Sequence, residues 1–114
     1  MSAILTIRDS ADVVVVDVSG RITLGEASNA LRDNIRGLAS EGRLKILLNL
    51  SGVSFMDSAG IGELASAHVS MTHKRGKLKL CGLTKRMRDL LQVTRLYMVL
   101  DIYEREEDAL HSFG

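Results

Sequence analysis

The 114-residue sequence has one cysteine, no proline, no tryptophan and few aromatic side chains, which make up 4% of its residues. The single cysteine, Cys81, cannot form an intramolecular disulfide, and its place in the apolar segment LKLCG indicates a buried thiol in a reducing compartment. Proteins that bind single-stranded nucleic acid stack bases on aromatic side chains, which are nearly absent here. The formal net charge of +1 gives no general attraction to nucleic acid or to a membrane surface. We therefore expect no direct nucleic-acid partner.

Long apolar segments are also absent. No uninterrupted apolar run approaches the roughly 18 residues that a membrane-spanning helix needs. The first residues, MSAILTIRDS, lack the basic and long apolar regions of a secretory signal peptide. A chain of 114 residues, 46% hydrophobic and 25% charged, can bury one core but is too short for two. We expect a single cytoplasmic domain over residues 1–114, without a membrane span.

Hydrophobic periodicity predicts alternating strands and helices. The segments 4–8 and 13–19 flank turn-forming residues and predict an antiparallel hairpin whose second strand ends at Gly20. Thr23 and Glu26, three residues apart, suggest a capping box at the start of the first helix. The segment 97–100 fits either the last strand or an extension of the third helix. Strands are expected over 4–8, 13–19, 45–50, 77–82 and about 99–103, with helices over about 23–41, 57–75, 84–94 and 104–113.

This order predicts an α/β layer fold with a mixed, mostly parallel sheet, an opening antiparallel hairpin and about four helices. In such sheets, ligands and partners gather beyond the carboxyl ends of the strands. The loops 20–26, 57–58 and 82–85 follow those ends, so they define one candidate face.

The junction SFMDSAGIGEL, residues 54–64, is the most unusual part of that face. Asp57 or Ser58 could cap the following helix, since both residue types accept hydrogen bonds from its first N–H groups. Gly60 and Gly62 are unexpected in a simple cap, because each glycine weakens a helix by roughly 1 kcal/mol relative to alanine. Glycines here would let another molecule approach Ser58 closely.

The junction does not match the sequence signature of a catalytic nucleophile or a phosphate-binding loop. The nucleophile elbow reads G-x-S-x-G, whereas the residues around Ser58 read M-D-S-A-G. Gly60 and Gly62 are not followed by the third glycine or the lysine of a phosphate-binding loop.

Metal and phosphoacceptor-aspartate chemistry also lack their partners. His68 and His73 are five residues apart and miss the i,i+4 spacing that places two metal ligands on one helix face. Asp57 follows a central strand, but the first strand ends in Arg8-Asp9 without the acidic pair that would hold Mg²⁺. We therefore expect no enzyme, no cofactor and no metal site.

Charges are unevenly distributed along the second half of the chain. Seven basic residues and no acidic ones fall within 74–88, whereas 101–108 holds five acidic residues and one arginine. Either the two segments balance each other in space, or the basic segment attracts an acidic partner or nucleic acid, and of these two the scarcity of aromatic side chains favours the acidic partner.

The strand and junction NLSGVSFMDSAGIG, residues 49–62, resemble the signature of the STAS domain family, with the D-S-x-G-[IL]-G pattern followed by a helix. The resemblance covers nearly the whole chain and is closer to the single-domain bacterial anti-sigma factor antagonists. It implies a STAS-like fold and a regulator without catalysis. Thr23 stands where many members carry Asp, and Asn49 replaces an Asp that is common in the family.

The resemblance also implies partners and a switch. The unphosphorylated antagonist binds an ATP-dependent serine kinase that is also the anti-sigma factor, and a sigma factor is released. The kinase then phosphorylates the serine matching Ser58, which ends binding, and a serine phosphatase restores it. The expected partner-binding residues are Thr23, Glu26, Asp57, Ser58, Gly60, Ile61 and Gly62. The alternative is a STAS-fold subunit of a transport or signalling scaffold complex, in which Ser58 is only a helix cap.

Overall fold

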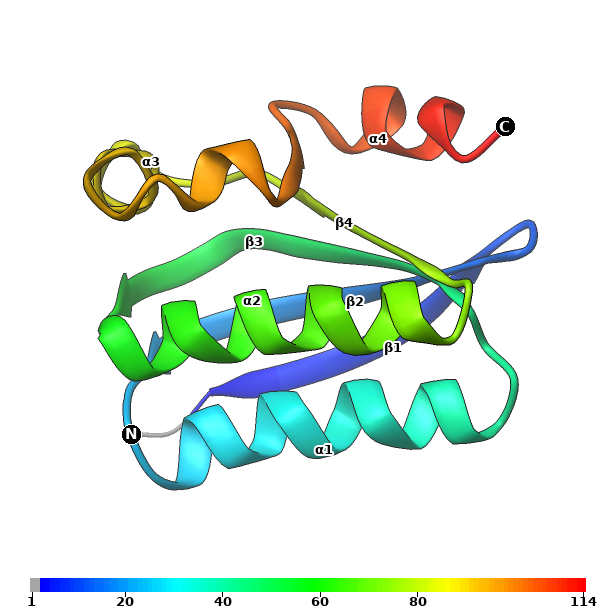
Figure 1. The fold of residues 1–114 in the computed structure, drawn as a ribbon, viewed down its shortest axis with the longest axis horizontal. Coiled ribbons are helices and arrows are strands. Elements are labelled where there is room, and N and C mark those ends of the chain that lie inside the picture. Colours follow the sequence, from blue (N-terminus) through cyan, green and yellow to red (C-terminus); the bar gives the residue numbers. More distant parts are fainter. Residues whose placement is uncertain (1–2) are drawn as a thin grey trace.

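The computed structural model describes residues 3–114, which form a five-stranded sheet and four α-helices (Figure 1). The strands are β1 (Ile4–Ser10), β2 (Val13–Ile22), β3 (Lys45–Met56), β4 (Lys77–Cys81) and β5 (Asp101–Tyr103). The helices are α1 (Glu26–Ser40), α2 (Ser58–His73), α3 (Lys85–Thr94) and α4 (Glu106–Ser112), with a short 3-10 helix η1 (Leu96–Met98) after α3. The sheet order is β1-β2-β3-β4-β5; β1 and β2 are antiparallel and the other pairs parallel. The predicted order of elements and the mixed sheet are confirmed.

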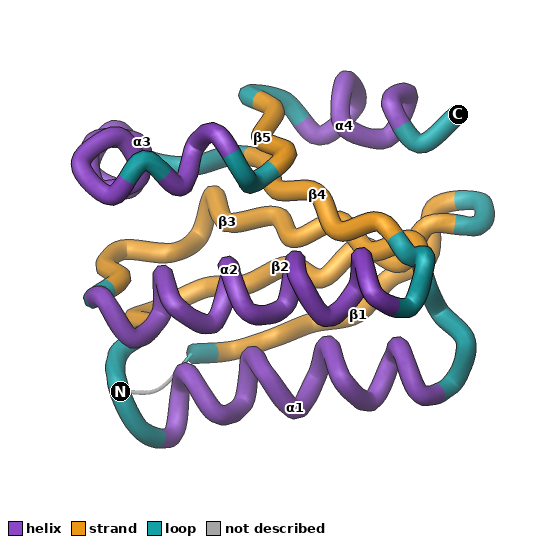
Figure 2. The backbone as a smooth tube through the Cα atoms, viewed as in Figure 1, coloured by secondary structure: helices purple, strands orange, loops and turns teal. Residues whose placement is uncertain are grey.

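Alternate residues of the strands separate two hydrophobic cores. Val14 and Val16 belong to the larger core, under α1, α2 and α3, whereas Val13 and Val15 belong to a smaller core with α4. Figure 2 shows α1 and α2 side by side along the strands, with α4 on the opposite side of the sheet. Leu47 is fully buried because β3, the central strand, is covered on both faces.

Three strands continue further than the sequence predicts, β1 by two residues to Ser10 and the next two by more. The expectation that Gly20 ends the second strand is wrong, since β2 reaches Ile22 and β3 continues beyond residue 50 to Met56. Gly20 has φ 97°, in the left-handed region that favours glycine, and the pairing with β3 shifts register between Gly20 and Arg21. Gly20 therefore lies at a bulge-like irregularity in the β2–β3 pairing, and the strand continues past it. This extension carries β3 up to Asp57, the N-cap residue of α2.

The predicted capping box at Thr23 and Glu26 is also wrong. The helix α1 begins at Glu26 after Gly25, whose φ of 109° favours glycine. The Gly25 N–H donates to Ser28 Oγ at 3.2 Å, and the Ser28 N–H donates to the Thr23 carbonyl at 3.2 Å. Glu26 lies in the first turn, where its charge is favourable to the helix dipole.

The basic and acidic segments partly neutralise each other because β4 pairs with β5. The Lys79 ammonium lies 3.3 Å from the Asp101 carboxylate, and Arg88 lies 3.7 Å from Glu104. Lys79 is only 7% exposed and also donates to the Ser112 carbonyl at the end of α4. These contacts support the interpretation that the two charged segments balance each other in space.

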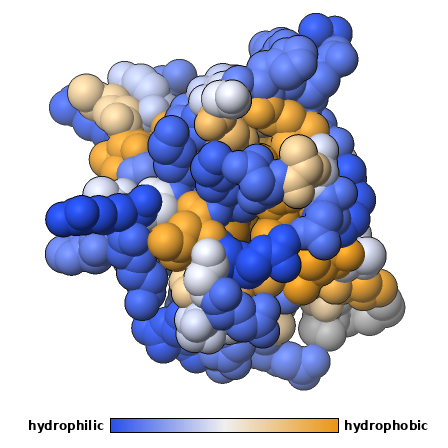
Figure 3. Space-filling model, turned by 90° about the vertical axis from the view of Figure 1, so that its right-hand side faces the viewer, coloured by the Kyte–Doolittle hydropathy of each residue, from blue (hydrophilic) through white to orange (hydrophobic). Residues whose placement is uncertain are grey.

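The end of the molecule that holds the β1–β2 turn lies opposite the start of α2. Hydrophilic side chains cover most of that end, with apolar side chains showing between them (Figure 3). Within residues 3–114, no helix is both long enough and apolar enough to cross a membrane.

Candidate functional site

The carboxylate of Asp57 joins two loops at the carboxyl end of the sheet. As the N-cap of α2, Asp57 accepts a hydrogen bond at Oδ1 from the Gly60 N–H, 3.0 Å away. Its Oδ2 accepts from the Leu24 N–H, also at 3.0 Å, and its own N–H donates to the Ile22 carbonyl at 3.2 Å. The hydrogen bonds from Gly60 and Leu24 hold the pKa of Asp57 below its usual range, because they favour the ionised carboxylate. The β2–α1 loop and the start of α2 therefore form one continuous surface.

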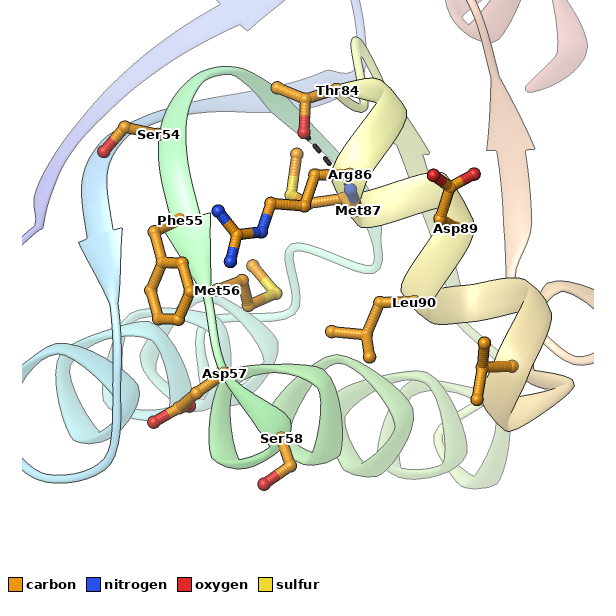
Figure 4. Close-up of a pocket in the computed structure, with 11 residues that line it drawn as sticks. Ser54, Phe55, Met56, Asp57, Ser58, Thr84, Arg86, Met87, Asp89 and Leu90 are labelled. Atoms are coloured by element: carbon orange, nitrogen blue, oxygen red, sulfur yellow. Dashed lines mark hydrogen bonds between the residues drawn. The ribbon is translucent and has the colours of Figure 1, made fainter.

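Ser58 is the first residue of α2 and is exposed. Its hydroxyl points away from α3 in Figure 4, and within residues 3–114 it has no hydrogen-bond partner. Of the two capping residues that the sequence allowed, the structure has Asp57, whose side chain supplies the capping oxygen, so Ser58 does not cap α2. The hydroxyl of Ser58 is accessible to a second molecule.

The two glycines of the junction have different surroundings. A Cβ atom at Gly60 would lie 2.5 Å from Met56 Cγ and 2.8 Å from the Ile22 carbonyl oxygen. Gly60 is therefore required by the close packing of α2 against the ends of β2 and β3, and not by an approaching partner. Gly62 is exposed, and a Cβ there would meet no described atom within 4 Å. The fold does not require glycine at position 62. That Gly62 allows another molecule to approach Ser58 closely stays a prediction.

The other partner-binding candidates are not equally accessible. Ile61 is 3% exposed and belongs to the larger core, so it and the buried Gly60 offer no surface to a rigid partner, contrary to our expectation. Glu26 is exposed, whereas Thr23 and Asp57 are half-buried. Leu24, which the sequence did not single out, is 80% exposed beside Asp57. The sequence did contain a sign of this exposure, because Leu24 is an apolar residue within the loop 20–26.

A groove of about 420 Å³ opens beside Ser58, between the end of β3 and α3. Figure 4 shows Met56, Met87 and Leu90 facing one another across it, with Arg86 above and Asp57 and Ser58 at its lower end. The N-cap Thr84, which accepts a hydrogen bond from the Met87 N–H at 3.2 Å, sets the start of α3 and hence this wall. Two of the three loops predicted to share a face, 57–58 and 82–85, thus contribute to the groove.

Phe55 lies at the edge of this groove between two arginines. Arg21 is paired with Phe55 across the β2–β3 ladder, and its guanidinium carbon lies 4.5 Å from the ring centroid. The guanidinium carbon of Arg86, from α3, lies 5.1 Å from the same centroid. Both distances suit cation–π contact. Sequence reasoning missed this cluster because it depends on the register of β3 beyond residue 50.

Asn49, the departure from the common Asp, lies within β3, beside Gly82 and well before the strand reaches Asp57. Its Nδ2 donates to Asp17 Oδ1 at 2.8 Å, and its Oδ1 accepts from the Ser51 N–H at 3.2 Å. Asp17 is also paired with Arg8, whose hydrogen bond holds the pKa of Asp17 below its usual range. A second carboxylate at position 49 would face Asp17, so the amide fits this environment better.

Groups suited to metal or thiol chemistry are not gathered here. Among residues 3–114, no cluster of three or more His, Cys, Asp or Glu side chains could hold a metal ion. Cys81 is 1% exposed, and burial raises the pKa of its thiol to about 11. This agrees with the buried thiol that the sequence indicates.

Comparison with known proteins agrees with this fold. A model of the STAS domain family matches residues 5–109. The anti-sigma-B factor antagonist of Bacillus subtilis is 28% identical over 110 residues, which are 96% of this chain and 99% of that protein. The anti-sigma F factor antagonist of Paenibacillus polymyxa is 31% identical over 65 residues, which are 57% of this chain and 56% of that protein.

Solved structures show the same architecture. An anti-sigma factor antagonist from Mycobacterium paratuberculosis superposes with a TM-score of 0.84 at 23% identity, over 97% of this chain and 93% of that one. The Bacillus cell fate determinant SpoIIAA in its phosphorylated form gives a TM-score of 0.74 at 22% identity, over 97% and 100% of the two chains. With a family match that includes the sheet, α1, α2 and α3, the chain belongs to the STAS domain family.

Proposed function

We propose that this protein is an anti-sigma factor antagonist controlled by phosphorylation of Ser58. In its unphosphorylated form it binds an ATP-dependent serine kinase that is also an anti-sigma factor, and a sigma factor is released. A serine phosphatase reverses the modification, and the whole cycle takes place in the cytoplasm without catalysis by this chain. The observation that carries the proposal is the exposed hydroxyl of Ser58 at the start of α2, which the fold does not use as a cap.

The fold can accept a phosphate at this position. A phosphoserine carries roughly −1.5 to −2 charges near neutral pH. At a helix N-terminus the dipole favours such a charge by about 0.3–1 kcal/mol. The neighbouring, half-buried carboxylate of Asp57 opposes it, but Ser58 is exposed to water, whose high dielectric constant weakens the repulsion. Phosphorylation should therefore leave the fold intact.

A bound partner would respond differently. The same charge, placed against a partner that lies close over Ser58 and Gly62, loses its hydration and can weaken the complex by several kcal/mol. Each 1.4 kcal/mol corresponds to about tenfold in affinity, so a hundredfold loss is within reach. We propose that Leu24, Glu26, Ser58 and Gly62 form this contact surface, with half-buried Thr23 and Asp57 between them.

The alternative function, a STAS-fold scaffold subunit, no longer explains Ser58. It assigned that serine to capping α2, and the structure gives this task to Asp57. A STAS-fold scaffold subunit would therefore have no stated use for an exposed serine at residue 58.

The test is incubation of the protein with candidate serine kinases and ATP, followed by mass spectrometry to locate the phosphate. We expect a single phosphate on Ser58 and none on the matched variant Ser58→Ala. Equal phosphate incorporation by wild type and Ser58→Ala would contradict the proposal.

A further inference from the structure

The groove beside Ser58 has an apolar floor that the chain itself does not fill. Met56 and Met87 at its base are 5% and 3% exposed, whereas Val93, which also lines it, is 81% exposed. A concave, mostly apolar surface of this kind is the usual form of a binding site.

Two arginines without an ion-pair partner among the described residues lie at the mouth of the groove. Within residues 3–114, neither Arg21 nor Arg86 has a carboxylate within ion-pair distance, although both are exposed. Their guanidinium groups are instead held against Phe55, at 4.5 and 5.1 Å from the ring centroid. The stacking fixes both cations in place and leaves their N–H donors for a further acceptor.

The two carboxylates that line the groove do not pair with these arginines. Asp89 lines the groove, but its carboxylate lies 3.1 Å from the Lys85 ammonium. Asp57 lies at the Ser58 end, where its two oxygens accept the Gly60 and Leu24 backbone N–H groups. The groove therefore has an apolar floor, a cationic edge at Phe55, and Ser58 at one end.

We propose that the groove docks a segment of the kinase whose apolar side chains fill the floor and whose carboxylates pair with Arg86 and Arg21. This inference rests on the proposed function and adds a second contact to it. Charge complementarity selects an acidic and apolar segment, and the position of Ser58 at the end of the groove selects the protein that phosphorylates it. Docking here would hold the kinase active site over Ser58 without taking part in phosphate transfer. It would therefore lower the KM for this chain and leave kcat unchanged.

The experiment measures steady-state phosphorylation of Ser58 by the cognate kinase for wild type, Arg86→Glu, and the double variant Arg21→Glu/Arg86→Glu. We expect the KM to rise about tenfold in Arg86→Glu and further in the double variant, with kcat within about twofold of wild type. The matched control is Arg88→Glu, on the same helix, because Arg88 is paired with Glu104 and does not line the groove. A second variant, Val93→Asp, alters the groove at an 81% exposed position and should raise the KM without affecting the core.

Three results would overturn the inference. An unchanged KM in both Arg86→Glu and Val93→Asp would show that the groove does not dock the kinase, while phosphorylation of Ser58 itself would still support the proposed function. Absence of phosphorylation in wild type would remove both proposals together. A concentration-dependent dimer in sedimentation velocity that Arg86→Glu abolishes would assign the groove to a second copy of this chain.

Discussion

The Asp57 carboxylate accepts a hydrogen bond from the Leu24 backbone N–H, 33 residues earlier in the chain, at 3.0 Å. The same side chain caps α2 through the Gly60 N–H. One residue thus fixes both the start of the helix and the loop that follows β2. The adjacent Ser58 does not cap the helix. The first two predictions follow from this difference between Asp57 and Ser58.

Asp57→Ala should lower the melting temperature by several degrees, because it leaves the Gly60 and Leu24 N–H groups without their acceptor. Ser58→Ala should change the free energy of unfolding by no more than about 0.5 kcal/mol, as is usual for an exposed position without a partner. Thermal unfolding followed by circular dichroism compares the two variants. A larger loss in Ser58→Ala than in Asp57→Ala would contradict the assignment of the cap.

Ser58→Asp should retain the melting temperature of wild type within a few degrees and yet weaken binding to the kinase. Aspartate brings one negative charge and lacks the third oxygen of a phosphate, so we expect a partial loss of affinity, about tenfold. The measured quantity is the ratio of dissociation constants of Ser58→Asp and Ser58→Ala, obtained by calorimetry. A ratio near one, with both proteins folded, would show that charge at residue 58 does not control binding.

Gly60→Ala and Gly62→Ala should act in opposite directions on stability. A methyl group at Gly60 overlaps Met56 and the Ile22 carbonyl, so we expect destabilisation by about 1–3 kcal/mol. At Gly62 the methyl group meets no described atom within 4 Å, and the better helix former should stabilise α2 by about 0.5–1 kcal/mol. Urea unfolding measures both changes. If the partner lies close over residue 62, Gly62→Ala should bind more weakly in spite of its greater stability, and unchanged affinity would place the contact elsewhere.

The stability contributed by Asp57 should depend on pH in one direction. Its pKa is lower in the folded protein than the ordinary value of 3.8, so folding favours the ionised carboxylate. The contribution is therefore complete well above pH 3.8 and is lost as the pH falls through the folded pKa. The pKa values of Asp12 and Asp17 are also lowered in the folded protein, so these residues contribute to the pH dependence of stability as well. The quantity to measure is therefore the difference in unfolding free energy between wild type and Asp57→Asn. We expect this difference to shrink below about pH 4, and a difference that grows on acidification would contradict the assignment.

Much of the fold could be predicted from sequence patterns. Hydrophobic periodicity predicted a strand over 45–50, where Leu47 is fully buried in β3, and a helix over about 23–41, where Leu31 and Ile35 are buried in α1. These signals are local, because they need only the identity and spacing of neighbouring residues in the chain. Whether a strand ends at a glycine cannot be decided from the neighbouring residues alone. Gly20 adopts a left-handed conformation within the ladder, and only the pairing with β3 shows that the strand continues.

The candidate site divides in the same way. The junction at Asp57 and Ser58 could be located from its residue types, but which of the two capped α2 depended on geometry. The requirement for Gly60 depends on the Ile22 carbonyl, 38 residues earlier by number, which no local pattern reveals. Arg21 and Arg86 meet only through Phe55, so their shared role at the groove needed the assembled sheet.

The separation of the two cores has a consequence for how the molecule opens. The helix α4 has seven residues and is attached by Ala109 and Phe113 in the smaller core, the Lys79 contact to Ser112, and the Arg8–Glu106 ion pair. None of these residues contributes to the larger core beneath α2. Local detachment of α4 would therefore expose Cys81 to solvent while the strands under Ser58 stay closed. We therefore expect α4 and the helix that begins at Ser58 to open as different cooperative units, so hydrogen exchange at α4 should proceed without fraying of α2.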